Sequence, residues 1–264
     1  MPTPLAALAT VLLNARHVVV FTGAGMSADS GIATFRDQAD SHWSRYKPEE
    51  LASVSGWKAN PQRVWAWYEA RRAQVMAATP NPGHLAIAQL GPLLSSASGR
   101  AVRVDVVTQN VDDLHERAGS TDVVHLHGSL FAPRCFACQR PGAFDDEPPD
   151  LNVLELQPPR CTHCGGLLRP GVVWFGEMLP TDAFNRAQKS MATCDAVLVV
   201  GTSGVVYPAA ELPIRARNAG KFLAEINPTP SNLAEHMNVQ CRAHAAQALP
   251  ELLALIGGPT SDDQ

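Results

Sequence analysis

The chain has 264 residues, of which 45% are apolar and 17% are charged, and its formal net charge is −4. This length suits one large α/β domain, or one such domain with a small insertion. The chain lacks the basic excess that binding to nucleic-acid phosphates requires, so we expect no sequence-specific nucleic-acid partner. No apolar run approaches the roughly 18 residues that a membrane span needs, so we expect no membrane partner.

The segment from Leu5 to Leu13 is apolar, but no basic residue precedes it and a run of valines follows closely. A signal peptide starts with a positively charged region, so we interpret this segment as a first helix. The expected compartment is the cytoplasm, and we expect the protein to be a monomer.

Residues 14–21 hold an apolar run rich in valine, residues 18–21, which leads directly into TGAGMS, residues 22–27. This is the strand, glycine turn and helix entry of a mononucleotide-binding unit. The glycines let the backbone approach a pyrophosphate, and a helix amino terminus favours its negative charge. Gly31 is displaced from the usual dinucleotide spacing, and no acidic residue follows a second strand at the usual distance. The loop alone is therefore also compatible with a structural turn.

A helix is expected around Val64–Met76, inside an insertion punctuated by prolines. Tyr68 and Arg71 lie on its one apolar stripe together with Val64 and Val75. An arginine in an apolar stripe is costly unless it meets an anion, and residues three apart can reach the same ligand.

The alternative for Arg71 is a structural salt bridge, for example to Glu69. Glu69 is only two residues away and faces off the stripe, which favours a ligand role for Arg71. Arg72 points about 100° away from Arg71 and is expected to be solvated.

Polar side chains follow two further apolar runs. Residues 102–107 lead into TQNVDD, residues 108–113, and residues 123–126 lead into His127. The carboxyl ends of parallel strands open into the ligand crevice, so these side chains are expected to face a substrate. His125 is the competing histidine, but it precedes the strand end and is interpreted as a packed residue.

Four cysteines form two knuckles of the C-x-x-C type with 22 residues between them: Cys135, Cys138, Cys161 and Cys164. Such pairs converge on one tetrahedral ion, and four thiolates close the shell of a structural Zn²⁺. The alternative is two disulfides, which a reducing cytoplasm disfavours. We predict about one zinc per chain.

Two later strands are expected at residues 196–200 and 221–226, and each ends in a polar turn, residues 201–204 and 227–229. Four strands thus share the pattern of an apolar run followed by a polar stop. Four converging ends favour one elongated ligand over four unrelated turns.

These patterns predict an α/β fold: a Rossmann-like parallel sheet with helices on both faces, a small zinc-binding module and a helical insertion. The expected division assigns the sheet domain to residues 1–36, 95–130 and 169–256. It assigns a cofactor-loop and helical insertion to 37–94, the zinc module to 131–168 and a disordered tail to 257–264.

Seven strings occur in the order typical of sirtuins: GAGMSADSGIATFRD, TQNVDDLHERAG, HLHGSL, the two C-x-x-C pairs, GVVWFGEMLP, GTSGVVYPAA and INP. The chain resembles this family of NAD-dependent protein lysine deacylases from about residue 5 to residue 256. The resemblance implies NAD as cosubstrate, a structural zinc, and acylated lysine segments of proteins as partners. The products would be nicotinamide, O-acyl-ADP-ribose and free lysine.

The resemblance also implies roles for individual residues. His127 matches the catalytic base, and Asn110 lies in the nicotinamide pocket with Gln109 and Asp112. Val172 and Phe175 belong to a segment, 172–176, that resembles the strand pairing with a substrate peptide. The remaining implied NAD contacts are Gly23, Ala24, Gly25, Ser27, Arg36, Gly201, Thr202, Ser203, Asn227 and Ala245.

Tyr68 and Arg71 match the pair that class III sirtuins use to recognise acidic acyl groups. A guanidinium–carboxylate contact would favour succinyl- or malonyl-lysine over acetyl-lysine. Two other activities stay open: an oxidoreductase using the same dinucleotide, and a protein ADP-ribosyltransferase that shares the first chemical step.

Overall fold

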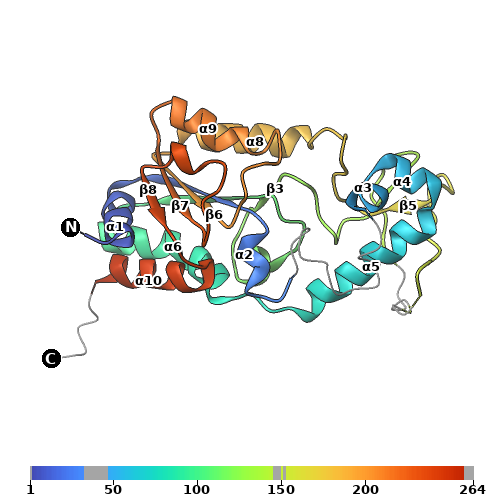
Figure 1. Cartoon of the computed structure of the whole chain (residues 1–264), viewed down its shortest axis with the longest axis horizontal. Coiled ribbons are helices and arrows are strands. Elements are labelled where there is room, and N and C mark those ends of the chain that lie inside the picture. The colour runs from blue at the N-terminus through green and yellow to red at the C-terminus, as the bar shows by residue number, and fades with distance from the viewer. Residues whose placement is uncertain (1, 33–46, 145–149, 151–152, 259–264) are drawn as a thin grey trace.

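The computed structural model describes residues 2–32, 47–144, 150 and 153–258. Arg36, the first part of the expected insertion (37–46) and the tail from residue 259 lie outside the described residues. The chain forms an elongated molecule with the sheet, α1 and α10 in one lobe, and helices α3–α5 in the other (Figure 1).

The large lobe contains a parallel sheet of six strands in the order β3-β2-β1-β6-β7-β8. The strand order reverses at β1, which pairs with β2 on one side and with β6 on the other. In such sheets the ligand crevice lies at the carboxyl ends beside this reversal. The strands are β1 His17–Thr22, β2 Arg103–Thr108, β3 Val124–His125, β6 Ala196–Val200, β7 Phe222–Ile226 and β8 Val239–Cys241.

Alternating side chains of the strands pack against helices on opposite faces of the sheet. Val18 and Val20 lie in the core under α1, α6 and α10, whereas Val19 and Phe21 lie in the core under α8 and α9. The period-two alternation of a strand explains this division. The helices around the sheet are α1 Pro4–Asn14, α2 Gly25–Ala28, α6 Pro82–Ser98, α7 Leu114–Arg117, α8 Thr181–Thr193, α9 Glu211–Asn218 and α10 Ala245–Gly257.

Helix α6 belongs to the sheet layer, although the expected division placed most of it in the insertion. It begins at a capping box in which Asn81 and His84 bond each other, and it ends at Gly99 with φ of 68°. Its apolar face supplies Ile87 and Leu90 to the core under the sheet. Burial of this face, rather than its place in the chain, decides which lobe α6 joins.

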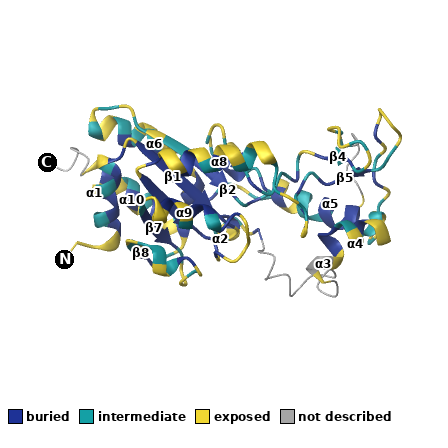
Figure 2. Cartoon of the chain, turned by 90° about the horizontal axis from the view of Figure 1, so that it is seen from above, coloured by how far each residue is buried: buried dark blue, intermediate teal, exposed yellow. Residues whose placement is uncertain are grey.

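The small lobe joins the remaining helices of the insertion to the cysteine module. Its core contains Trp57, Trp67 and Trp174, each at most 3% exposed, together with Cys135 and Cys161. Figure 2 shows α5, β4 and β5 together in this lobe, and residues 64–69 of α5 are buried on all sides of the helix. The elements are α3 Pro48–Leu51, α4 Val54–Ala59, α5 Pro61–Ala77, β4 Arg134–Cys135 and β5 Leu168–Arg169.

The expected parallel sheet with helices on both faces is confirmed, as are the first helix and the strands at the four polar stops. The short edge strand β8 has no counterpart among the predicted strands. Helix α10 begins at Ala245 and contains Pro250. Among the described residues, none of the helices has the length and apolar character that a bilayer span requires.

Candidate active site

A cavity of about 580 Å³ opens at the carboxyl ends of the strands. Segments far apart in the sequence meet there because β1, β2, β3, β6 and β7 all end at this edge. Most of the predicted site residues line the cavity: Gly23, Ala24, Gly25, Ser27, Tyr68, Arg71, Gln109, Asn110, Asp112, His127, Val172, Phe175, Gly201, Thr202, Ser203 and Asn227.

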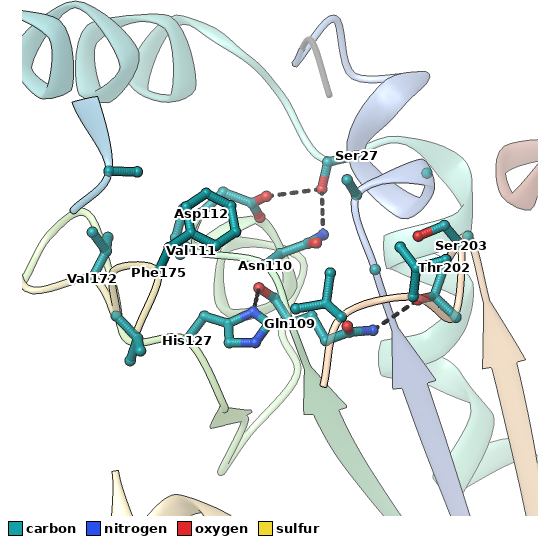
Figure 3. A pocket seen from close by; sticks show the side chains of 18 of the residues that line it. Ser27, Gln109, Asn110, Val111, Asp112, His127, Val172, Phe175, Thr202 and Ser203 are labelled. Atoms are coloured by element: carbon teal, nitrogen blue, oxygen red, sulfur yellow. Dashed lines mark hydrogen bonds between the residues drawn. The ribbon is translucent and has the colours of Figure 1, made fainter. Parts of the chain in front are cut away.

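His127 is held in one tautomer at the end of β3. Its Nδ1 lies 2.9 Å from the carbonyl oxygen of Gln109 (Figure 3). A carbonyl oxygen only accepts, so Nδ1 carries the hydrogen and Nε2 keeps a free lone pair. Burial lowers the pKa of His127, against the raising effect of the Gln109 carbonyl. The imidazole is therefore neutral at neutral pH and able to accept a proton.

His125 is engaged at both ring nitrogens. Nδ1 lies 3.0 Å from the carbonyl oxygen of Asn110, and Nε2 lies 2.7 Å from Oε1 of Glu116. Burial acts to lower the pKa of His125, but the Glu116 carboxylate and the Asn110 carbonyl together raise it above its ordinary value. With an acceptor at each ring nitrogen, His125 is thus a structural imidazolium behind the loop that carries Asn110.

Asn110, Ser27 and Asp112 form a buried chain of hydrogen bonds (Figure 3). Asn110 Nδ2 donates to Ser27 Oγ at 3.1 Å, and Ser27 Oγ donates to Asp112 Oδ2 at 2.9 Å. Burial raises the pKa of Asp112, although the Leu114 amide and the Ser27 hydroxyl stabilise its carboxylate. The chain orients the Asn110 amide so that its oxygen is available to a ligand.

Gln109 links the loops that follow β2 and β6. Its Nε2 donates to Thr202 Oγ1 at 2.8 Å, and Asn227 Nδ2 donates to the Thr202 carbonyl at 3.2 Å. These bonds hold the ends of β2, β6 and β7 in one continuous wall. A dinucleotide lying along the wall would contact all three loops.

The glycines of the first loop are needed for contact between two loops. A Cβ on Gly25 would lie 2.8 Å from the Gly201 Cα, and one on Gly201 would lie 2.4 Å from the Met26 amide nitrogen. The amides of Gly23 and Gly25 donate to the carbonyls of Val200 and Gly201, respectively. Close packing of the backbones is thus a second reason for glycine here, besides the expected approach of a pyrophosphate.

Tyr68 and Arg71 both lie on the cavity side of α5. Tyr68 is 5% exposed, and its hydroxyl accepts a hydrogen bond of 3.1 Å from Trp174 Nε1. Burial lowers the pKa of Arg71, while the neighbouring Tyr68 and Asp112 raise it. The expected meeting of this pair at one ligand position is consistent with their shared place in the cavity lining.

Glu69 pairs with Arg72, which is the arginine that we expected to be solvated. Arg72 donates to Glu69 through Nε and a terminal nitrogen, and its guanidinium lies 4.0 Å above the Phe144 ring. The solvation prediction for Arg72 is wrong because Phe144 and Glu69 together enclose its head group. The salt bridge of Glu69 therefore goes to Arg72.

The segment 172–176 is extended but already bonded to its own chain. The amides of Val173 and Phe175 donate to the carbonyls of His127 and Ala52, and that of Trp174 donates to Glu177. Val172 is 3% exposed whereas Phe175 is 52% exposed. A pairing peptide would therefore have to use the remaining backbone groups of this segment.

Ala245 packs in the core beside α2 and does not line the cavity, unlike the other predicted NAD contacts that the structure describes. It begins α10, is 3% exposed in the core under the sheet, and its carbonyl oxygen would be 2.9 Å from a Cβ at Gly83. The cavity lining does not include it. Arg36 lies outside the described residues.

Several lining residues were not predicted from the sequence: Ile32, Ala52, Leu130, Glu177, Val205, Val206, Tyr207, Pro208, Pro230, Ser231 and Asn232. Most of them extend the polar turns after β6 and β7 by a few residues. The polar turn after each strand was the sequence signal for these residues. The strand pattern does not show how far each turn extends. Trp174 lies within the predicted segment 172–176, but the contact of its indole with Tyr68 was not predicted.

The four cysteines converge as expected for a zinc ion. Their sulfurs lie within 4.8 Å of one another, with Cys135 and Cys164 at 3.5 Å and Cys138 and Cys161 at 3.7 Å. A tetrahedron with Zn–S bonds of about 2.3 Å has edges of about 3.8 Å. All four are free thiols, so the disulfide alternative is excluded. The donor set fits structural Zn²⁺ and leaves no open ligand position.

Comparison with known proteins agrees with this arrangement. The sequence model of the Sir2 family matches residues 23–208. A protein of Pseudomonas aeruginosa named NAD-dependent protein deacylase 1 is 49% identical, over 94% of this chain and 97% of that protein.

Two solved structures extend the comparison. A Sir2 homologue in complex with NAD superposes with a TM-score of 0.85 at 42% identity, covering 95% of this chain and 93% of that one. A Sir2 protein bound to a myristoylated histone peptide gives a TM-score of 0.74 at 36% identity, covering 96% of each chain. The chain belongs to the Sir2 family.

Proposed function

We propose that this protein is an NAD-dependent protein lysine deacylase that yields nicotinamide, O-acyl-ADP-ribose and free lysine. The observation that carries the proposal is the cavity, where a neutral, oriented His127 stands beside Asn110 at the ends of five parallel strands. Family membership, a relative named as a deacylase and a homologue solved with NAD support the same activity.

The cavity residues divide the reaction between them. Gln109, Asn110 and Asp112 hold the nicotinamide half of NAD, while the loops after β1, β6 and β7 hold the adenosine half. The carbonyl oxygen of the acyl-lysine attacks the ribose carbon as its bond to nicotinamide breaks. His127 Nε2 would then take the proton of the ribose hydroxyl that attacks the acyl carbon. The lysine amine would leave with a proton, and water would add to the acyl carbon as its bond to the other ribose oxygen opens, which leaves the acyl group on the ribose. Asp112 acts through Ser27, whose hydroxyl fixes the Asn110 amide.

The substrate peptide lies at the mouth of the cavity. Phe175, Val206 and Tyr207 line this mouth and are 52%, 40% and 64% exposed, respectively. Exposed apolar side chains around a cavity mark a binding surface. Backbone pairing with segment 172–176 would add to these contacts, and a homologue solved with an acylated peptide supports this kind of partner.

The acyl group enters between Tyr68 and Arg71, and the enzyme prefers succinyl- or malonyl-lysine over acetyl-lysine. A guanidinium and a phenol in one apolar wall together suit a carboxylate at the end of the acyl chain. Glu69 is already paired with Arg72, so the structural salt bridge considered for Arg71 is not made with Glu69.

The enzyme acts in the cytoplasm as a monomer. Free thiols at Cys194 and Cys241 suit a reducing compartment, and one chain supplies both the cavity lining and the four zinc ligands. Size-exclusion chromatography with light scattering measures the mass in solution, and a dimer would contradict this part of the proposal.

One assay tests the activity. The protein is incubated with NAD and a matched set of acetyl-, succinyl- and malonyl-lysine peptides, and nicotinamide and O-acyl-ADP-ribose are quantified by mass spectrometry. We expect both products in equal amounts. Absorbance of reduced nicotinamide dinucleotide without release of free nicotinamide would indicate an oxidoreductase. Transfer of label from NAD to protein, without formation of O-acyl-ADP-ribose, would indicate an ADP-ribosyltransferase.

A further inference from the structure

Trp174 and Tyr68 join two segments of the cavity wall that lie 106 residues apart in the chain. The indole Nε1 donates to the phenol oxygen of Tyr68 at 3.1 Å, and both side chains line the cavity. The indole N–H can only donate, so the phenol oxygen is the acceptor. Tyr68 and Trp174 are 5% and 2% exposed, so this bond is shielded from water.

The indole of Trp174 is held from three directions. Its backbone amide donates to Glu177 at 2.8 Å, and its ring lies 3.3 Å from the guanidinium carbon of the buried Arg169. The Trp57 ring packs at 5.7 Å on another side. Arg169 and Glu177 are themselves an ion pair. The N–H of Trp174 is therefore a fixed donor, and it determines where the phenol oxygen lies.

The bond from Trp174 determines which hydrogen bonds the Tyr68 hydroxyl can still make. With the indole N–H donated to its oxygen, the Tyr68 hydroxyl must place its own hydrogen elsewhere. Among the described residues the structure gives this hydrogen no acceptor, and the cavity lies beside it. A hydrogen bond received by a hydroxyl also strengthens the bond that it donates. A carboxylate between Tyr68 and Arg71 is the acceptor that this arrangement suits.

We propose that Trp174 is a positioning residue for acyl selectivity, which acts by holding the Tyr68 hydroxyl as a donor to acyl groups that end in a carboxylate. This inference rests on the proposed deacylase function and on the role given there to Tyr68 and Arg71. An acetyl group has no carboxylate, so its removal does not depend on the Trp174–Tyr68 bond.

The test is a double-mutant cycle with Trp174→Phe, Tyr68→Phe and the combined variant. For each protein, kcat and KM are measured with succinyl-lysine and acetyl-lysine forms of one peptide at saturating NAD. Trp174→Phe keeps an aromatic ring beside Arg169 but removes the N–H. We expect the ratio of desuccinylation to deacetylation, as kcat/KM, to fall about five- to tenfold, mainly through KM, which is the effect of one hydrogen bond. In the Tyr68→Phe background the same change should leave the ratio unaltered.

Trp57→Phe is the matched control, because Trp57 is a buried indole of the same aromatic cluster that does not line the cavity. It should change stability but leave the ratio as in the wild type. If Trp174→Phe folds poorly, Trp174→Leu, which also lacks the N–H, should shift the ratio by the same factor. Equal loss of both activities, an unchanged ratio, or additive effects in the combined variant would each overturn the role of Trp174. Wild-type protein that releases no nicotinamide with either peptide would instead refute the deacylase function, and wild-type protein without preference for the succinyl peptide would refute the acidic-acyl proposal.

Discussion

His125 Nδ1 donates to the carbonyl oxygen of Asn110 at 3.0 Å, so a histidine outside the cavity lining holds the backbone of a cavity residue. Its other nitrogen lies 2.7 Å from Glu116, which places a carboxylate behind the imidazole. The two histidines of the β3 region thus have different tasks. His125 supports the loop as a cation, while His127 faces the cavity as a neutral imidazole.

The His125–Glu116 pair predicts a pH window for stability. The pKa of His125 is raised in the folded protein. Its contribution to the free energy of unfolding is therefore complete below the pKa of an unfolded histidine, about 6.5, and is lost as pH rises through the folded pKa. Burial acts to raise the pKa of Glu116, but His125 lowers it overall, so the contribution of Glu116 is present above about pH 4.3 and is lost as pH falls through the folded pKa. The melting temperatures of the wild type and Glu116→Gln should differ most at about pH 5–6.5.

Glu235→Gln is the control for this experiment, because Glu235 is 82% exposed beside His236 at 3.7 Å. It should change the melting temperature little at any pH, as is usual for an exposed pair. A difference between wild type and Glu116→Gln that is constant from pH 5 to pH 9 would contradict the imidazolium assignment of His125.

Replacing His127 by alanine should abolish deacylation and leave NAD binding intact. The histidine is needed for the proton of the ribose hydroxyl, and loss of a general base costs about 10²- to 10⁴-fold in rate. Turnover is measured as O-acyl-ADP-ribose formed, and NAD binding is measured by calorimetry. His236→Ala, outside the cavity lining, serves as the control and should keep full activity. Near-normal turnover of His127→Ala would remove His127 as the base.

Arg71→Met should selectively lose activity on acidic acyl groups. Removing a charged donor to a carboxylate costs about 10- to 100-fold, and acetyl-lysine makes no such contact. Desuccinylation and deacetylation are compared as kcat/KM on one peptide. Arg72→Met is the neighbouring control, since Arg72 is paired with Glu69, and it should lower the melting temperature without changing selectivity. Equal loss of both activities in Arg71→Met would show that Arg71 is only structural.

The sheet could be predicted because its strands are encoded locally. The runs that became β1, β2 and β6 are rich in valine and the run that became β7 is mainly apolar, and each stops at a polar turn that a buried strand would not contain. Parallel pairing then brings all these turns to one edge, which is why separate motifs converged on one cavity. The cysteine spacing is equally local, and the sulfurs meet as it predicted.

The features that sequence reasoning missed depend on contacts between distant segments. Whether Arg72 is solvated depends on Phe144, which lies 72 positions later and packs under its guanidinium. The lobe to which α6 belongs is decided by its packing against α10 and the sheet. The role of Trp174 depends on one atom of Tyr68. No periodicity or composition signals such pairs.

Removing zinc should unfold the small lobe and abolish deacylation with it. The module is joined to α5 by the bond from the Leu156 amide to the Gln62 carbonyl at 3.1 Å and by Arg72 against Phe144. Structural zinc sites contribute about 10–16 kcal/mol of apparent binding free energy to folding, so chelation should lower the melting temperature strongly. Elemental analysis should give about one zinc per chain.

Cys161→Ser should reproduce the effect of chelation, whereas Cys194→Ser, at a buried cysteine outside the cluster, should retain zinc. Active protein from which elemental analysis finds no zinc would exclude a structural metal here.

Gly201→Ala should destabilise the protein and weaken NAD binding together. Gly201 has φ of 59°, a conformation that costs other residues about 1–2 kcal/mol, and a Cβ there would lie 2.4 Å from the Met26 amide nitrogen. The clash would separate the loops after β1 and β6, which together form one wall of the cavity. Gly220→Ala is the control, because Gly220 also has positive φ, 79°, but a Cβ there meets no atom within 4 Å. Gly220→Ala should lower the free energy of unfolding only through backbone strain, and calorimetry should show the wild-type affinity for NAD. If both variants bind NAD equally well, contact between the two loops is not what shapes the dinucleotide site.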